Sequence, residues 1–169
     1  MTDPKLLKEI LKDFYNPRVV FYGFNVINDA SALVQTGSGY RTMKVVDSAL
    51  TSSNSSEMGA GDIIVREENL MSFIIPQNFT AVFAIVKAVT EAGTSAKYMR
   101  LMLGYGPGGN TTKEIARSAE TGADYRTEMT LVGSYSGIVA SAADTHKILV
   151  ETHDAQEYSS INILIGVVL

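Results

Sequence analysis

The sequence predicts an all-β protein, an antiparallel jelly-roll β-sandwich with a short amphipathic helix at its N-terminus. Two observations support this fold class. After Pro17 the apolar spacing changes from a helical to a strand period, and short stretches rich in β-branched and aromatic residues then alternate with turn-forming clusters. The 169 residues are enough for about one domain. We expect a helical arm at residues 1–16 and one sandwich domain at residues 17–169.

The N-terminal arm is predicted from its end signals and its apolar stripe. Asp3 can cap a helix, Pro4 suits the first turn, and Asn16 followed by Pro17 ends it. This stripe either packs on its own domain or docks on a neighbouring subunit or a larger lattice such as a capsid shell. Its side chains, which share one helical face, are Leu7, Ile10, Leu11 and Phe14.

The strands follow in order along the chain. Residues 36–62 are mostly Ser, Thr, Gly and Asn, so we expect long loops there with one or two short edge strands. The remaining pattern predicts strands at residues 19–27, 63–66, 70–75, 80–89, 98–105, 125–131, 147–153 and 160–169.

Two of these strands are apolar on both faces. In residues 80–89 and 160–169, the alternate positions that oppose the most apolar set are also mostly uncharged. Such strands must be covered on both sides, either by another layer of this chain or by a neighbouring subunit. Because the only predicted helix is short, we favour the neighbour. The predicted oligomer interface consists of Asn162, Leu164, Gly166, Val168, Phe83 and Ile85.

The order of motifs from Met71 onward adds a family resemblance. It runs from Phe73-Ile-Ile-Pro76 through the strand at 82–86 to Ala142-Ala-Asp144 and a last strand of alternating aliphatic residues. This order resembles the trimeric jelly roll of the complement globular-head and tumour-necrosis-factor-like superfamily, over about 100 residues. The resemblance implies a ten-strand sandwich whose last strand lies near a three-fold axis, in domains that cap fibres or decorate virus heads. The chain lacks a collagen-like stalk, which fits a decoration subunit better than a fibre tip.

Composition excludes several classes of partner. The net charge is −4, and lysine and arginine cluster only in the N-terminal arm, so we expect no nucleic-acid surface. No stretch approaches the roughly 20 apolar residues that a membrane-spanning helix needs. Residues 1–12 are charged throughout and hold no apolar core of signal-peptide length. We therefore expect synthesis in the host cytoplasm, and the resemblance to domains that decorate virus heads implies a location in the virion.

One glycine motif looks like a nucleotide site. Gly104-Tyr-Gly106-Pro-Gly-Gly109 matches G-x-G-x-x-G and follows a predicted strand. A dinucleotide site needs a βαβ unit, whereas Pro107 interrupts this loop and antiparallel-type strands follow it. We interpret the motif as part of a flexible inter-strand loop.

The sequence offers no catalytic or metal-binding constellation. His146 and His153 are seven residues apart, so they point to opposite faces of their strand and are expected as exposed strand-end residues. The carboxylates are spread over loops and strand edges, and the chain has no cysteine. We therefore predict no catalytic residues, no cofactor and no metal.

These observations favour a non-enzymatic structural subunit of a phage particle, a capsid decoration or cement protein that assembles as a homotrimer. The alternative is a carbohydrate- or receptor-binding head of a fibre or tail protein, with glycans as partners and loops such as 36–62 and 104–124 making the contacts. A small β-sandwich enzyme or isolated ligand-binding domain is the third hypothesis.

Overall fold

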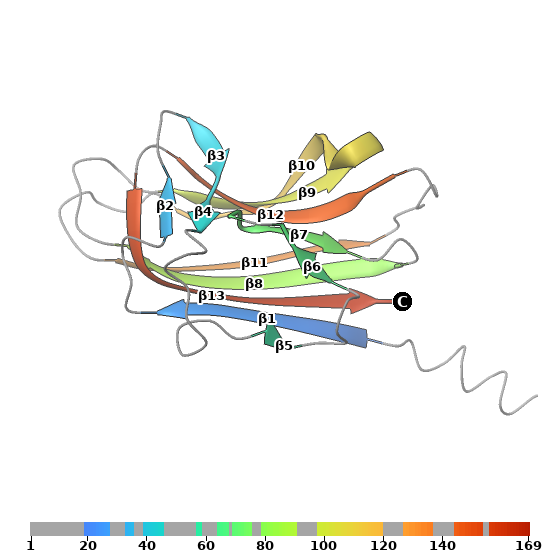
Figure 1. The fold of residues 1–169 in the computed structure, drawn as a ribbon, viewed down its shortest axis with the longest axis horizontal. Helices are drawn as coiled ribbons and strands as arrows, with labels where there is room; N and C mark the ends of the chain where they lie inside the picture. Colours follow the sequence, from blue (N-terminus) through green and yellow to red (C-terminus); the bar gives the residue numbers. More distant parts are fainter. Residues whose placement is uncertain are drawn as a thin grey trace, which may run out of the picture.

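A computed structural model gives the structure of the chain (Figure 1). It describes residues 19–27, 33–35, 39–45, 57–58, 64–67, 69–75, 79–90, 98–119, 127–136, 144–153 and 156–169. The predicted helical arm, with its apolar stripe, lies outside these residues.

The described residues form strands and one short 3-10 turn, at Pro107–Gly109. The strands are β1 (Val19–Ile27), β2 (Leu33–Gln35), β3 (Tyr40–Thr42), β4 (Lys44–Val45), β5 (Glu57–Met58), β6 (Val65–Arg66), β7 (Ser72–Ile75), β8 (Ala81–Thr90), β9 (Met99–Tyr105), β10 (Thr111–Arg117), β11 (Thr127–Ser136), β12 (His146–His153) and β13 (Gln156–Val168).

The strands build two antiparallel sheets that lie one above the other in Figure 1. The lower sheet has the order β11-β8-β13-β1-β5, with β2 and β4 attached through β13. The upper sheet has the order β10-β9-β12-β7-β6, with β3 paired to β12. From β7 to β13 the chain changes sheet at every connection except the β9–β10 hairpin, which is the crossing pattern of a jelly roll.

The core lies between the two sheets and follows the strand alternation. On the lower sheet the inward set includes Val82, Ala84 and Val86 of β8, and Ile163 and Ile165 of β13, all nearly inaccessible to solvent. These side chains meet the inward residues of the upper sheet, among them Met99, Leu101, Leu103, Ile148 and Val150. The predicted alternation of both two-sided strands is confirmed, and one face of each is covered by this chain's own second layer.

The glycine motif lies in a tight turn between two strands, as the predicted inter-strand loop implies, but the wider loop expected over 104–124 is interrupted by strand β10. Strand β9 runs through Gly104 to Tyr105, and β10 returns beside it from Thr111 to Arg117. Gly106, Gly108 and Gly109 have φ values of 77°, 69° and 70°, a region that favours glycine. A Cβ at Gly104 would lie 2.7 Å from the Gly109 carbonyl oxygen. The glycines of the motif therefore allow the backbone to form the turn of the β9–β10 hairpin.

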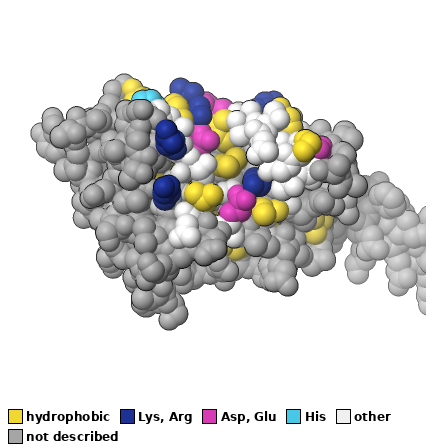
Figure 2. Space-filling view, turned by 45° about the horizontal axis from the view of Figure 1, so that its top comes forward, with side chains coloured by type: hydrophobic (Ala, Val, Ile, Leu, Met, Phe, Trp, Pro, Cys, Tyr) yellow, Lys and Arg dark blue, Asp and Glu magenta, His cyan; other side chains and the backbone are white. Residues whose placement is uncertain are grey.

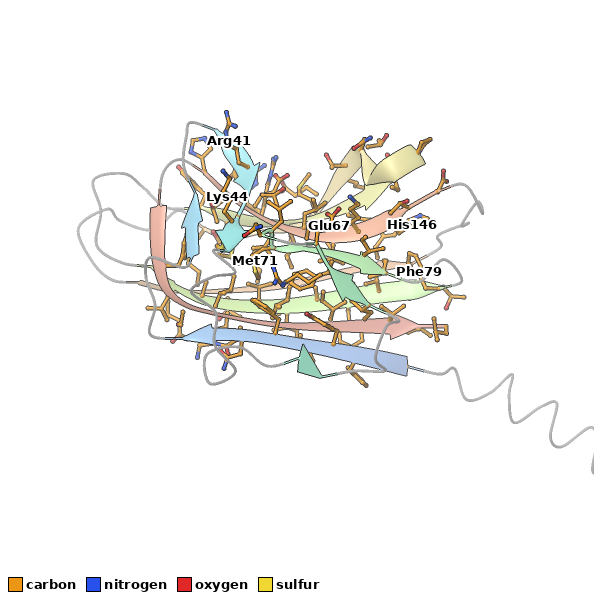
Figure 3. The ribbon with its side chains drawn as sticks, viewed as in Figure 1. Arg41, Lys44, Glu67, Met71, Phe79 and His146 are labelled. Carbon is orange, nitrogen blue, oxygen red and sulfur yellow. The ribbon has the colours of Figure 1, made fainter. Side chains whose placement is uncertain are left out.

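The histidines do point to opposite faces of β12, but His146 is not exposed. It faces the core with 4% of its surface accessible, and its ring meets the Phe79 ring edge-on at 5.1 Å (Figure 3). The reason is that β12 lies in the middle of the upper sheet, so even its first residue is covered from the core side. His153 is half-buried on the outward face, between the rings of Tyr40 and Tyr98.

Candidate functional site

The outward face of the lower sheet, here called the lower face, carries the most exposed apolar surface that the described residues show. Strands β11, β8, β13 and β1 are adjacent and in register, so their outward side chains form rows across the sheet. Two neighbouring rows are here called the apolar rows. The first consists of Val132, Ile85, Leu164 and Gly23, and the second of Ser134, Phe83, Gly166 and Phe21.

Several large apolar side chains on this face remain open to solvent. Val132 is 67% exposed, Phe21 44%, Val19 40% and Ile85 38%. Isolated exposed apolar residues are ordinary, whereas a contiguous group on adjacent strands is typical of an interaction surface.

The six residues predicted as an interface all lie on this face. Phe83, Leu164 and Val168 are half-buried, Ile85 and Asn162 are exposed, and Gly166 is buried. The structure thus places the predicted set together, on the central strands β8 and β13.

Gly166 is buried because an aromatic ring lies on it. A Cβ at this position would overlap the Phe83 ring, which spans from β8 across β13. On the far side, Phe21 of β1 meets Phe83 edge-on, with ring centroids 6.0 Å apart. The glycine therefore lets two rings from non-adjacent strands form one aromatic ridge across the face.

Three apolar residues of the face, Val19, Phe21 and Val132, were missed in the sequence. The signal in β1 was present, because Val19 and Phe21 alternate with the buried Tyr22 and with Phe24. What the pattern could not supply was the pairing of β1 with β13, which brings Phe21 beside Gly166.

One end of the lower face is polar. Asn25, Asn162, Lys87 and Thr130 form the next row across the same strands, here called the polar row. The Lys87 ammonium lies 2.9 Å from a Glu128 carboxylate oxygen. Between this row and the apolar rows is an open hollow at Gly23, lined also by Asn25, Ile85, Lys87, Asn162 and Leu164.

The outward face of the upper sheet, here called the upper face, is organised differently. Figure 2 shows basic, acidic and hydrophobic side chains mixed over the part of this face that it brings forward. Arg100 donates from Nε to Glu151 Oε2 at 2.7 Å and stacks 3.8 Å over the Tyr40 ring. Arg117 pairs with Glu114 at 2.6 Å. Because Arg100 covers one face of the Tyr40 ring, that side is not available for stacking against a sugar.

A second group of interacting polar side chains lies elsewhere on the upper face. Lys147 donates to Glu67 at 2.7 Å, and the Ser72 hydroxyl also donates to this carboxylate (Figure 3). Burial by itself would raise the pKa of Glu67, but the hydrogen bonds from Lys147 and Ser72 outweigh it and lower the pKa below its ordinary value. These contacts hold β12, β7 and the segment before Ser72 together, and they are already satisfied within the chain.

Two kinds of feature are absent from the described residues. Among them no three His, Asp or Glu side chains converge as a metal site would require. Within the same ranges, no helix has the length and apolar character needed to cross a bilayer.

Comparison with known proteins gives similarity in structure but none in sequence. No family model matches the chain, and no curated protein matches it. Murine APRIL at pH 5.0 aligns with a TM-score of 0.55 and 9% identity, covering 90% of this chain and 100% of that one. Eiger TNF from S. frugiperda aligns with a TM-score of 0.53 and 8% identity, over 91% and 94% of the two chains.

The PRD1 vertex protein P5 also aligns, over 89% of this chain and 96% of that one at 9% identity. Its TM-score of 0.45 is too low to support an argument about this chain. The alignments with APRIL and Eiger confirm the predicted resemblance at the level of architecture. The chain has the antiparallel jelly-roll fold of tumour-necrosis-factor-like proteins.

Proposed function

We propose that this chain is a non-enzymatic structural subunit that assembles as a homotrimer through the lower face. The observation that carries the proposal is the exposed apolar surface on four adjacent strands, centred on β8 and β13. Removing such surface from water is the main favourable term in protein association, at about 25 cal/mol per Å².

We choose the lower face as the contact because the two outward faces differ in their exposed side chains. On the upper face, Arg100 pairs with Glu151 and Arg117 with Glu114, and the Tyr40 ring contacts an arginine and a histidine. The lower face presents Phe21, Ile85 and Val132 with no covering layer in the part of the chain that the structure describes. A neighbouring copy supplies the missing layer in our proposal.

The proposal extends to the setting in which the trimer works. A β-rich chain with only 19% charged residues and no cysteine suits a particle component, and we propose a phage capsid decoration or cement protein in the virion. The apolar stripe of the N-terminal arm would attach it to the capsid shell, through Leu7, Ile10, Leu11 and Phe14. The fold shared with APRIL and Eiger supports a jelly-roll subunit and leaves the host assembly to experiment.

The test is the mass of the purified chain in solution, measured by light scattering after size exclusion. We expect a single trimeric species at micromolar concentration. Leu164→Lys should dissociate it, weakening association at least about 100-fold, because the variant places an unpaired charge in a dry contact. Thr112→Lys is the matched control, since Thr112 is exposed on β10 of the upper sheet and the variant should stay trimeric.

Two outcomes would overturn the proposal. If the wild-type chain stays monomeric at these concentrations, it does not assemble through the lower face. A Leu164→Lys variant that keeps the wild-type mass would place the contact elsewhere. A glycan array separates the alternative binding-head function, because a cement subunit should bind no glycan on it.

A further inference from the structure

The apolar contact proposed above does not explain the polar row at its border. It takes one residue from each of four neighbouring strands, and Asn162 on the central strand β13 is exposed. Along β13, Asn162 is the next outward residue before Leu164, so the polar row directly borders the apolar rows. A contact that covers Leu164 therefore reaches Asn162.

The chemistry of the row matches a second copy of itself. An asparagine amide both donates and accepts hydrogen bonds, so the same amide from several copies can pair around a common axis. Lys87 and Glu128 lie 2.9 Å apart at this end of the face, so each copy offers both signs of charge to its neighbour. Because Lys87 and Glu128 cancel one another's charge, the polar end of the lower face has no net charge from this pair that would attract a strongly charged partner.

Asn25 adds an unsatisfied group at the same place. Its Oδ1 is sealed from solvent and has no hydrogen-bond partner among the described residues, while its side chain lines the hollow beside Gly23. Buried acceptors in native proteins are nearly always paired. If the Asn25 side chain turned toward the hollow, an amide group of a neighbouring copy could donate a hydrogen bond to its Oδ1.

The apolar rows alone do not define one arrangement. Apolar contact is non-directional, so two such faces gain similar energy in several alignments. A slip of two residues along the strands would move Lys87 of one copy onto Ile85 or Leu164 of the next. The slip would bury an ammonium against aliphatic groups and leave the amides unpaired, which disfavours it strongly.

We propose that Asn162, supported by Asn25 and Lys87, binds the polar row of a neighbouring copy and thereby fixes the register and the number of copies in the assembly. The apolar rows supply affinity, and the polar row supplies specificity, as a single buried asparagine does in some coiled coils. This inference rests on the proposed self-association through the lower face.

The experiment compares Asn162→Leu with the wild type by native mass spectrometry and light scattering at matched micromolar concentration. Asn162→Leu should stay associated but populate other oligomers, raising their share about tenfold. Thr112→Leu is the control, because it adds the same side chain to an exposed position of the upper sheet and leaves the whole lower face intact. It should keep the single wild-type mass.

The outcomes separate this inference from the function on which it rests. A monomeric wild type overturns the self-association itself. A trimeric wild type together with an Asn162→Leu variant of one unchanged mass overturns only the role of the polar row, as does a monomeric but folded Asn162→Leu. If Asn162→Leu fails to fold, Lys87→Met answers in its place, since loss of the charge should also broaden the distribution of masses.

Discussion

The two outward faces of the sandwich differ in whether their side chains are satisfied within one chain. On the upper face Arg100 contacts Glu151 and Tyr40, and Lys147 contacts Glu67. On the lower face the apolar side chains of four neighbouring strands lie side by side, and four of them remain more than a third exposed, namely Val19, Phe21, Ile85 and Val132. The comparison teaches that one fold can present one face whose charged side chains are paired within the chain and another whose apolar side chains stay open to solvent.

The same contrast is visible in one glycine from each outward face. At Gly104 of the upper sheet an added Cβ would meet a backbone oxygen, whereas at Gly166 of the lower sheet it would meet the end of a movable Phe83 ring. A backbone obstacle cannot move without breaking the hairpin, but a ring can turn toward solvent.

The largest predicted effect on stability comes from Gly104, and Gly166 is its comparison. Gly104→Ala should lower the free energy of unfolding by about 3 kcal/mol, because the β9–β10 turn must distort to admit the methyl group. Gly166→Ala should cost less than about 1 kcal/mol, since the Phe83 ring can swing away. Urea unfolding of both variants measures the difference, and equal losses would show that the upper turn is as adaptable as the aromatic ridge.

A smaller effect is expected from cutting the ionic network of the upper face. Arg100→Ala should lower the free energy of unfolding by about 2 kcal/mol, because it leaves the mostly buried Glu151 carboxylate without its donor. The mass in solution should not change. Arg117→Ala is the control, since this exposed arginine should matter less for stability. A change of oligomeric state in Arg100→Ala would mean that the upper face also takes part in assembly.

The smallest predicted effect concerns the layer between the faces, at His146. Burial lowers the pKa of His146 below its ordinary value of 6.5, and nearby Asp144 opposes this only in part. Because the folded pKa lies below the unfolded one, the unfolded chain takes up the proton first. Stability is therefore complete above about pH 6.5 and decreases as the pH falls through the interval below it.

Urea midpoints measured between about pH 7.5 and pH 5 test this dependence. His146→Phe should flatten the decrease, because it removes the titrating group and keeps a ring against Phe79. A wild-type slope in His146→Phe would assign the acid sensitivity to other groups.

The sequence predicted the strands that alternate cleanly and missed those that do not. Residues 19–27 were predicted as a strand and form β1 with the same bounds. Strand β10 was missed because Thr111, Lys113 and Arg117 are exposed and its polar residues give no apolar alternation. The start of β10 was also hidden, because the glycine motif directly before it resembles a nucleotide loop.

For the candidate site, the sequence indicated which side chains share a face but not which strands are neighbours. Leu164 and Ile85 could be predicted as outward residues from parity alone. Their direct pairing, and the contact of Phe21 with Phe83, depend on strands far apart in the chain. The exposure of His146 was wrongly predicted for the same reason, because its cover comes from Phe79 of another segment.

The position of β13 makes the lower face a late product of folding. This strand is far from β1 and β8 along the chain, yet it lies between them in the middle of the lower sheet. During synthesis, β1 and β8 leave the ribosome long before the strand that joins them, so no contiguous lower face exists at that stage. Under the proposed function, a chain in which β13 has not yet paired with β8 and β1 therefore lacks the surface for assembly.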